Sequence, residues 1–329
     1  MQELIIGQND AGKRLDRFLA RVCPLLPPSM LNKYIRLKRV KINAKRTTGD
    51  YKLAVGDVCQ LYINDEYLAR PDADTAYKTL VPELDVIYED ENILLVNKKA
   101  GQIVHSDDKE ELNTTVTHIQ AYLYAAGQWQ PERENAFAPA LCNRIDKNTS
   151  GIVIAAKNAA ALREINQAIK DRQLEKRYLC LINGKISPKE GRLTGYLFKD
   201  SKKNMVFVKD TSEKGTKTAI TQYKTLWSDK NISLLECNLI TGRTHQIRAQ
   251  LAHAGHPLLG DGKYGVLKDS SETLPGTQNI DWLGVQVDFR KNRKFQALCS
   301  YKLVFKFADP QNPLAYLNGR EFKVERVLL

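Results

Sequence analysis

The sequence predicts an α+β protein, with a small N-terminal α+β module followed by a larger mixed α/β domain of mostly antiparallel strands. The chain has 329 residues, more than one compact domain usually contains. Short alternating apolar runs typical of strands are interspersed with a few segments of helical spacing. Residues 71–83 mix Pro, Asp and Thr without apolar periodicity, which predicts a linker between domains at 1–70 and 84–329.

The module at 1–70 contains two segments of helical spacing and two of strand spacing. Apolar residues recur at helical intervals over 15–22 and over 31–37, and a proline-rich break separates the two predicted helices. Residues 40–43 and 58–63 alternate between apolar and polar side chains, which predicts two short strands.

Most of the net charge of +12 lies in this module. Between Lys13 and Lys52 there are twelve basic residues and two acidic ones, Asp16 and Asp50, and residues 30–46 contain no acid at all. A helix that is merely solvated would mix both signs, whereas a face of one sign is what phosphate neutralisation requires. The pattern favours nucleic-acid binding. The candidate contacts are Arg14, Lys33, Arg36, Lys38, Arg39, Lys41, Lys45 and Arg46.

The domain at 84–329 begins with a predicted hairpin, 84–88 and 93–96, followed by a buried strand at 151–156. Asn158 is expected to cap a helix that extends to about residue 169. Further strands are expected up to about residue 240 and again at 301–307. A helix over 244–254, capped by Thr244 and with Ala254 on its core face, is expected between them.

Several classes of protein are disfavoured. No apolar run approaches the roughly 18 residues of a membrane span, and charges occupy the start where a signal peptide would be apolar. Six scattered cysteines form no CxxC pair, which predicts free thiols and a cytoplasmic protein. Neither GxGxxG nor GxxxxGK[ST] occurs, so no phosphate-cradling loop of those types is expected.

The first candidate site is the polar segment 143–151, which leads directly into the apolar run 152–156. A loop held by a buried strand is a common position for catalytic groups. Arg144 and Asp146, two positions apart, would point to the same side of an extended backbone. The alternative is an Asx-turn in which Asp146 only accepts bonds from nearby backbone amides.

The second candidate site is the segment 242–265. His245 and Arg248 would share one face of a helix at a spacing of three residues. Arg248 could equally be a solvent-facing cation. A zinc site formed by His245, His253 and His256 is disfavoured, because no nearby carboxylate or cysteine completes a familiar ligand spacing.

Taken together, the two segments resemble the RluA family of pseudouridine synthases. The resemblance rests on Asn143-Arg144-Ile145-Asp146 with Asn148 to Gly151, on Gly242-Arg243-Thr244-His245-Gln246-Ile247-Arg248, and on Gly255 to Asp261. Lys176-Arg177-Tyr178 and Gln296-Ala297-Leu298 follow the family's order, and residues 12–19 with 40–43 resemble an S4-type RNA-binding module. Asn143, Lys99 and Cys299 depart from the family pattern, which affects the subgroup rather than the expected nucleophile.

The resemblance implies an isomerase that converts uridine to pseudouridine without a cofactor or metal. Asp146 would be the nucleophile, attacking either C1′ or the base at C6, and Arg248 would keep it ionised. The ring of Tyr178 would lie against the uracil. The remaining implied substrate contacts are Arg144, Leu298, Thr149, His245 and Lys176.

The implied partner is RNA, most often large-subunit ribosomal RNA with tRNA second, and the chain is expected to act as a monomer away from membranes. Two other classes stay open on sequence grounds. A non-catalytic RNA-binding or ribosome-assembly protein would explain the basic module but would not need Asp146, Tyr178 and Arg248 together. A metal-dependent nuclease would explain the histidines but would show a carboxylate cluster.

Overall fold

The computed structural model describes residues 1–68, 72–105, 113–265, 278–280, 283–289 and 294–329. Its α-helices are α1 (Leu15–Val22), α2 (Pro28–Arg36), α3 (Thr115–Ala125), α4 (Ala159–Lys170) and α5 (Gln246–His253), and its 3₁₀ helices are η1 (Asp65–Leu68), η2 (Asp72–Lys78) and η4 (Ala315–Leu317). None of the helices in these ranges is long and apolar enough to cross a membrane.

The strands of the described ranges form three sheets. They are β1 (Gln2–Ile5), β2 (Val40–Ile42), β3 (Lys45–Arg46), β4 (Val58–Leu61), β5 (Val86–Glu89), β6 (Ile93–Lys98), β7 (Ala140–Leu141), β8 (Ser150–Ala156), β9 (Leu174–Asn183), β10 (Glu190–Asp200), β11 (Met205–Lys209), β12 (Lys217–Ser228), β13 (Ile232–Leu239), β14 (Gln278–Ile280), β15 (Val285–Asp288), β16 (Leu298–Phe305), β17 (Glu321–Lys323) and β18 (Arg326–Leu328).

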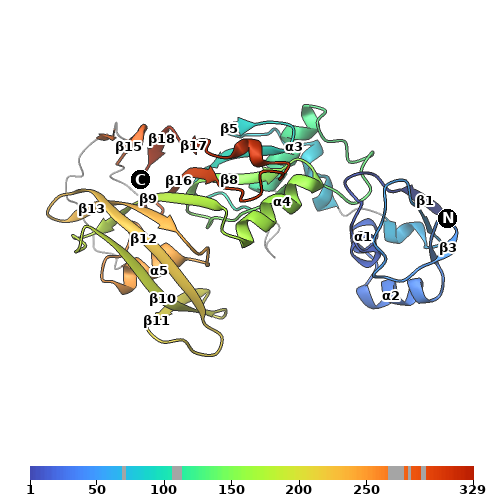
Figure 1. Ribbon diagram of the computed structural model, residues 1–329, viewed down its shortest axis with the longest axis horizontal. Coiled ribbons are helices and arrows are strands. Elements are labelled where there is room, and N and C mark those ends of the chain that lie inside the picture. The colour runs from blue at the N-terminus through green and yellow to red at the C-terminus, as the bar shows by residue number, and fades with distance from the viewer. Residues whose placement is uncertain (69–71, 106–112, 266–277, 281–282, 290–293) are drawn as a thin grey trace.

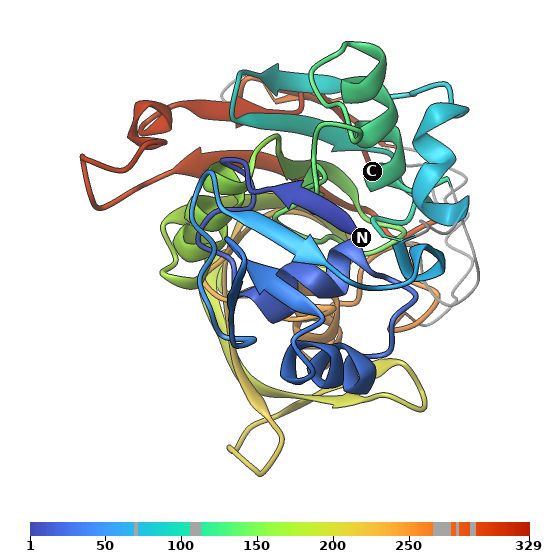
Figure 2. The same cartoon turned by 90° about the vertical axis from the view of Figure 1, so that its right-hand side faces the viewer.

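The N-terminal module has its own sheet and its own core. Its antiparallel strands follow the order β1-β4-β2-β3, and α1 and α2 pack with them around Phe18, Leu31 and Leu61 (Figure 2). Both predicted helices and both predicted strands are present. Strands β1 and β3 were not predicted from the sequence. The β2–β3 hairpin turns through Asn43 and Ala44, which both have positive φ, as a two-residue type I′ turn requires.

The larger sheet confirms the mixed, mostly antiparallel α+β class. Its strand order is β11-β10-β12-β13-β9-β16-β8-β6-β5 (Figure 1). In addition, β17 pairs with β16, and β7 pairs with β8. Within the described ranges β8 and β16 are its one parallel pair. The β5–β6 hairpin, the buried strand β8 and the helix capped by Asn158, whose side chain accepts from the Ala161 amide, all match the sequence predictions.

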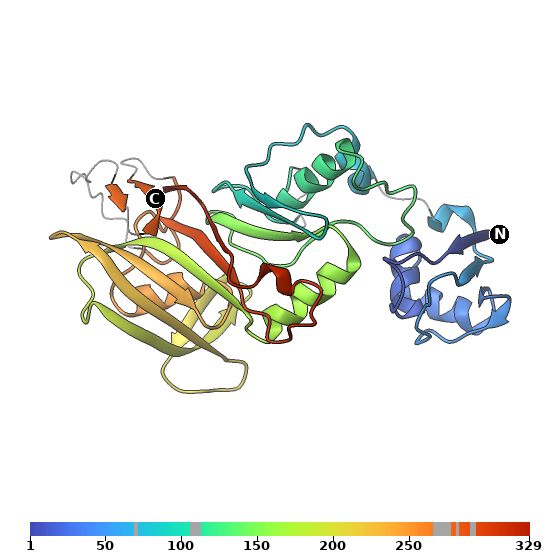
Figure 3. The ribbon, with the colours of Figure 1, turned by 45° about the horizontal axis from the view of Figure 1, so that its top comes forward.

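The helices cover both faces of this sheet (Figure 3). On one face α3 and α5 contribute Ile119 and Ile247 to a core cluster that also contains Tyr178 and Cys180 of β9. On the other face α4 packs through Ile165 with the C-terminal strands. The candidate site lies on the face of α3 and α5, because that is the face to which Tyr178 belongs.

The expected linker is partly structured. It contains η2, and the ring of Tyr77 packs edge-on against Tyr124 and Trp129 at centroid distances of 5.2 and 4.8 Å. Only one residue of this segment, Tyr77, makes these ring contacts, so they leave no periodic apolar pattern in the sequence. Tyr77 therefore belongs to the core of the larger domain.

Direct hydrogen bonds join the module to the larger domain. Asn9 accepts from the backbone amide of Ala159 (3.0 Å) and donates to Glu134 (2.8 Å), and Asn135 donates to the carbonyl of Ile5 (2.7 Å). These polar side chains lie far from each other in sequence and carry no periodic signal. The contacts place the module at one end of the molecule (Figure 1).

Candidate active site

Asp146 lies in the loop between β7 and β8. The amide of Thr149 donates to the backbone carbonyl of Asp146 (3.0 Å), and Asn143 accepts from the amide of Ile154 (2.8 Å), so the loop is tied to β8. Buried Ile145 anchors it between Arg144 and Asp146, whose side chains both reach the same cavity. In the described chain no backbone amide donates to the Asp146 carboxylate, so the alternative Asx-turn is not formed.

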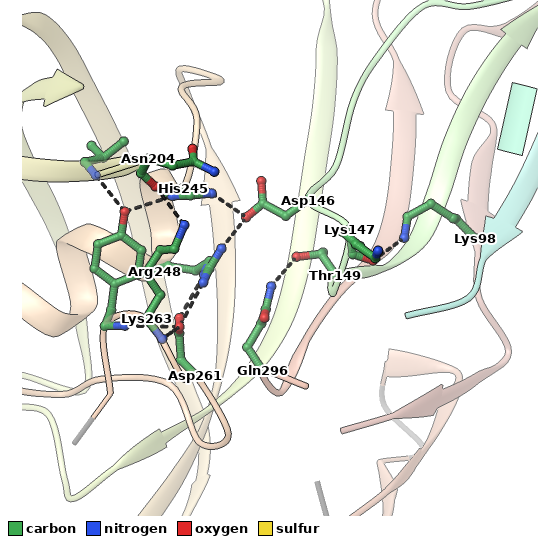
Figure 4. A network of polar contacts seen from close by, with 12 residues as sticks. Lys98, Asp146, Lys147, Thr149, Asn204, His245, Arg248, Asp261, Lys263 and Gln296 are labelled. Carbon is green, nitrogen blue, oxygen red and sulfur yellow. Dashed lines mark hydrogen bonds and ion pairs between the residues drawn. The ribbon is translucent and has the colours of Figure 1, made fainter. Parts of the chain in front are cut away.

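The carboxylate of Asp146 is instead bound by Arg248. Arg248 Nη1 lies 3.0 Å from Asp146 Oδ2, while Nε and Nη2 donate to the two oxygens of Asp261 at 2.8 Å each (Figure 4). The Arg248 side chain is 8% exposed and that of Asp146 is 25% exposed. Burial alone would lower the pKa of Arg248, but the hydrogen bonds and charges of Asp261 and Asp146 raise it. Arg248 is thus a buried, ion-paired cation, not a solvent-facing one.

Asp261 is held from several sides. The backbone amides of Lys263 and Tyr264 donate to its Oδ1 at 3.0 and 3.2 Å, in addition to the two bonds from Arg248. Burial acts to raise the pKa of Asp261, yet Arg248 and these amides lower it below its usual range. This carboxylate fixes the guanidinium and leaves Nη1 directed at Asp146.

His245 lies on the other side of Asp146, with Nε2 3.9 Å from Oδ2. Its Nδ1 shares a hydrogen bond of 2.8 Å with the hydroxyl of Tyr264, whose ring also lies 5.1 Å below the Arg248 guanidinium. Burial is the largest influence on the His245 imidazole and lowers its pKa. His245 and Arg248 thus both face Asp146, although His245 precedes α5 and does not share a helical face with Arg248.

Helix α5 begins later than predicted, and Thr244 does not cap it. His245 precedes the helix in the left-handed conformation (φ 53°, ψ 21°), and the side chain of Gln246 accepts from the Arg243 amide at 3.1 Å. This bond ties the start of α5 to the preceding loop, and in the described chain no side chain caps the first turn of the helix. Ala254, predicted on the core face, is exposed because the helix has already ended.

Asp146 opens into a cavity of about 1110 Å³. Every catalytic and substrate-contact residue named from the sequence contributes to its lining: Asp146, Arg248, Tyr178, Arg144, Leu298, Thr149, His245 and Lys176. Tyr178 and Leu298 come from the neighbouring strands β9 and β16 and are almost fully buried. Burial raises the pKa of Tyr178 to about 12, which keeps its hydroxyl neutral.

The basic residues of the module lie elsewhere. Arg14, Lys33, Arg36, Lys38, Arg39, Lys45 and Arg46 are exposed and Lys41 is half-buried, and none of them lines the cavity. Arg39 lies over the Tyr34 ring and Lys41 over the Tyr62 ring, each at 5.2 Å. The module therefore presents a basic, partly aromatic surface separate from the cavity.

Sequence reasoning missed Lys98 as well as Asp261. Lys98 is 1% exposed, and its ammonium donates to the carbonyls of Lys99, Gln102 and Lys147 at 2.8 to 2.9 Å, which supports the backbone next to Asp146 (Figure 4). Burial lowers the pKa of Lys98 to about 7, although the charge of Asp146 acts in the opposite direction. The sequence signal that could have identified Lys98 is its position at the end of an apolar strand.

The histidines do not converge on a metal site. His253 lies 3.5 Å from Asp210, and His256 contacts the carbonyl of Asn183, while His245 faces Asp146. Across the ranges that the structure describes, no group of three His, Cys, Asp or Glu side chains is arranged to hold a metal ion.

Comparison with known proteins gives one consistent family. The family model for RNA pseudouridylate synthase matches residues 92–253. An uncharacterized RNA pseudouridine synthase of Mycoplasma genitalium is 32% identical over 307 residues, covering 92% of this chain and 88% of that protein. The ribosomal large subunit pseudouridine synthase C of Rickettsia bellii is 32% identical over 272 residues, covering 80% and 86%.

A solved human structure, RNA pseudouridylate synthase domain containing 1, supports the fold. It superposes with a TM-score of 0.50 at 19% identity, over 75% of this chain and 91% of that one. The matched segment contains Asp146, Tyr178 and Arg248, the residues that meet at the cavity. The chain belongs to the family of RNA pseudouridylate synthases.

Proposed function

We propose that the chain isomerises specific uridines of large-subunit ribosomal RNA, with Asp146 as the nucleophile. The observation that carries this proposal is the single polar chain Asp261–Arg248–Asp146 at a cavity lined by Tyr178 and Leu298. Ribosomal RNA is favoured over tRNA because several relatives at about 30% identity are named ribosomal large subunit pseudouridine synthase C.

The reaction rearranges bonds without gain or loss of atoms. The N1–C1′ bond breaks, the uracil turns, the C5–C1′ bond forms, and the proton on C5 is replaced by one on N1. A carboxylate can form a covalent adduct at C1′ or C6, or stabilise positive charge at C1′. The Arg248 guanidinium, 3.0 Å from Asp146 Oδ2, holds this carboxylate in an ion pair.

The other cavity residues suit a base that must turn. An aromatic ring supports a uracil by stacking, about 1 to 3 kcal/mol, without the fixed directions of hydrogen bonds, and Tyr178 offers such a ring beside apolar Leu298. The base must leave its helix before both of its edges can react. Exposed Arg144, at the rim beside Asp146, is suited to fill the space left in the RNA.

The proposal also assigns residues 1–70 to RNA binding as an S4-like domain, with 84–329 as the catalytic domain. The positively charged surface of α2, β2 and β3 supports this assignment, because it offers exposed cations to the phosphates of RNA.

Two measurements test the proposal. A site-by-site pseudouridine map of ribosomal RNA and tRNA, from cells with and without this gene, identifies the substrate. Sites lost only from tRNA would contradict the ribosomal assignment. Chelator-resistant activity distinguishes the enzyme from a metal-dependent nuclease, and unchanged maps would favour a non-catalytic RNA-binding protein.

The role of Asp146 is tested by Asp146→Asn. The amide is nearly isosteric but cannot be an anionic nucleophile, so we expect pseudouridine formation to be abolished while fold and RNA affinity are kept. The measurement is tritium release from RNA labelled at uridine C5. The control is Asp210→Asn, since the Asp210 side chain is 89% exposed. Release near the wild-type rate by folded Asp146→Asn would reject Asp146 as nucleophile.

A further inference from the structure

Lys176 projects into the cavity beside the residues already described. It lies on β9 two positions before Tyr178, a spacing that places both side chains on one face of the strand, and both line the cavity. Its Nζ lies next to the loop that leads into α5. A Cβ built on Gly242 would be 3.6 Å from that Nζ.

The ammonium of Lys176 has no partner among the residues that the structure describes. In the part of the chain that the structure describes, it forms no hydrogen bond or ion pair, whereas Lys98 donates to three carbonyls and Lys306 is paired with Glu175. Burial lowers the pKa of Lys176, and no neighbouring carboxylate opposes that effect. A desolvated cation without a partner is unfavourable unless a ligand supplies the opposite charge.

We infer that Lys176 binds a backbone phosphate of the RNA, on the linkage immediately 5′ or 3′ of the uridine held against Tyr178. The inference rests on the proposed function, because it takes the ligand to be RNA. Phosphates are the anionic groups that RNA carries, and one lies on each side of every nucleotide. The Asp146 carboxylate already has Arg248 as its partner, so Lys176 is left to receive the substrate's charge.

The test pairs a side-chain change with a change in the RNA. Each phosphate flanking the target uridine is replaced in turn by a neutral methylphosphonate, and Kd and kcat/KM are measured for wild type and Lys176→Met. We expect one replacement to weaken wild-type binding about tenfold or more. Lys176→Met should bind the unmodified RNA as weakly as the wild type binds the modified RNA. Replacing that phosphate should not weaken the binding of Lys176→Met any further.

Matched variants separate phosphate binding from general effects. Lys176→Arg should keep most of the affinity, because the charge is retained. Lys185→Met removes an exposed lysine outside the cavity and should show the full wild-type loss at the same linkage. The thermal midpoint of Lys176→Met should be unchanged or higher, since the variant removes a half-buried charge that has no partner among the described residues, whereas a structural role would lower it.

The outcomes for Lys176 and for the proposed function are separate. Equal losses in wild type and Lys176→Met at every linkage, or a lowered thermal midpoint with unchanged Kd, would overturn the inference about Lys176. Pseudouridine formed by the wild type in the same RNA tests the proposed function. If none forms, the binding cycle still decides the role of Lys176.

Discussion

Arg248 binds two carboxylates whose surroundings differ. Asp261 is fully enclosed, with 0% of its side chain exposed, whereas Asp146 faces the cavity. Removing the guanidinium therefore has two effects. It removes the ion-pair partner of Asp146, and it leaves the Asp261 carboxylate buried without its cationic partner.

We expect Arg248→Met to lower kcat more than it weakens RNA binding, and to reduce the free energy of unfolding by about 3 to 5 kcal/mol, as breaking a buried pair does. Kinetics on folded protein and urea unfolding measure the two effects. Arg248→Lys should be intermediate in both, because it keeps the charge but not the paired bonds to Asp261. Unchanged kcat with weaker binding would make Arg248 an ordinary phosphate contact.

Lys98 makes stability depend on pH. Its pKa of about 7 in the folded protein lies below that of an unfolded lysine, about 10.4. Between these values the unfolded chain binds more protons than the folded one, so the contribution of Lys98 to the free energy of unfolding rises with pH.

From pH 7 to pH 9, the free energy of unfolding of the wild type should therefore gain up to about 2 to 3 kcal/mol relative to that of Lys98→Met. Denaturant unfolding at the two pH values measures this difference. Lys99→Met is the matched control, because Lys99 is 73% exposed and should leave the pH dependence as in the wild type. Parallel pH profiles for wild type and Lys98→Met would contradict the assigned pKa.

Among the elements, the parallel pair β8–β16 holds the Asp146 loop in place. Gly151 lies in this pair with φ of +109°, and a Cβ built there would come within 2.2 Å of the Ser300 carbonyl oxygen. The close approach of the two backbones thus requires a residue without a side chain.

We expect Gly151→Ala to destabilise the protein far more than Gly127→Ala. Gly127 also has positive φ, +68°, but a Cβ there would meet nothing within 4 Å. Gly127→Ala should therefore show only the backbone penalty, about 1 to 2 kcal/mol, while Gly151→Ala adds a clash with backbone atoms. Thermal unfolding compares them. Similar midpoints would mean that β8 and β16 can separate easily.

At the scale of the whole molecule, the basic surface of the module and the cavity with Asp146 occupy different parts. The basic surface lies on the module, and the cavity with Asp146 lies on the larger sheet. Deletion of residues 1–70 removes that surface and the bonds of Asn9 and Ile5 to the larger domain, but keeps Tyr77 and its aromatic partners.

We expect this deletion to weaken RNA binding, with a log-log salt slope reduced by about 0.7 to 0.9 for each phosphate that the protein no longer neutralises. The value of kcat at saturating RNA should fall much less than kcat/KM, because the module is remote from the reacting base. Both are measured on one RNA fragment with full-length and shortened protein. Identical slopes and affinities would show that the module does not bind this RNA.

The sequence by itself determined several of the elements and the central residues of the cavity. Helical and alternating spacing reports which face of a segment is buried, so α1, α2, the β5–β6 hairpin, β8 and α4 were predictable. The motifs around Asp146 and Arg248 named side chains that do meet, although they are 102 positions apart.

Only the tertiary structure decided which groups support those side chains. Asp261, Lys98 and the contacts of Asn9 are single polar residues whose partners lie on other elements, so no local period identifies them. Tertiary contacts also decided where α5 starts. Thr244 was expected to cap this helix, but the residue before it is His245, which is left-handed and shares a hydrogen bond with Tyr264. Local spacing fixes burial, whereas the pairing of buried charges depends on distances that exist only after the chain has folded.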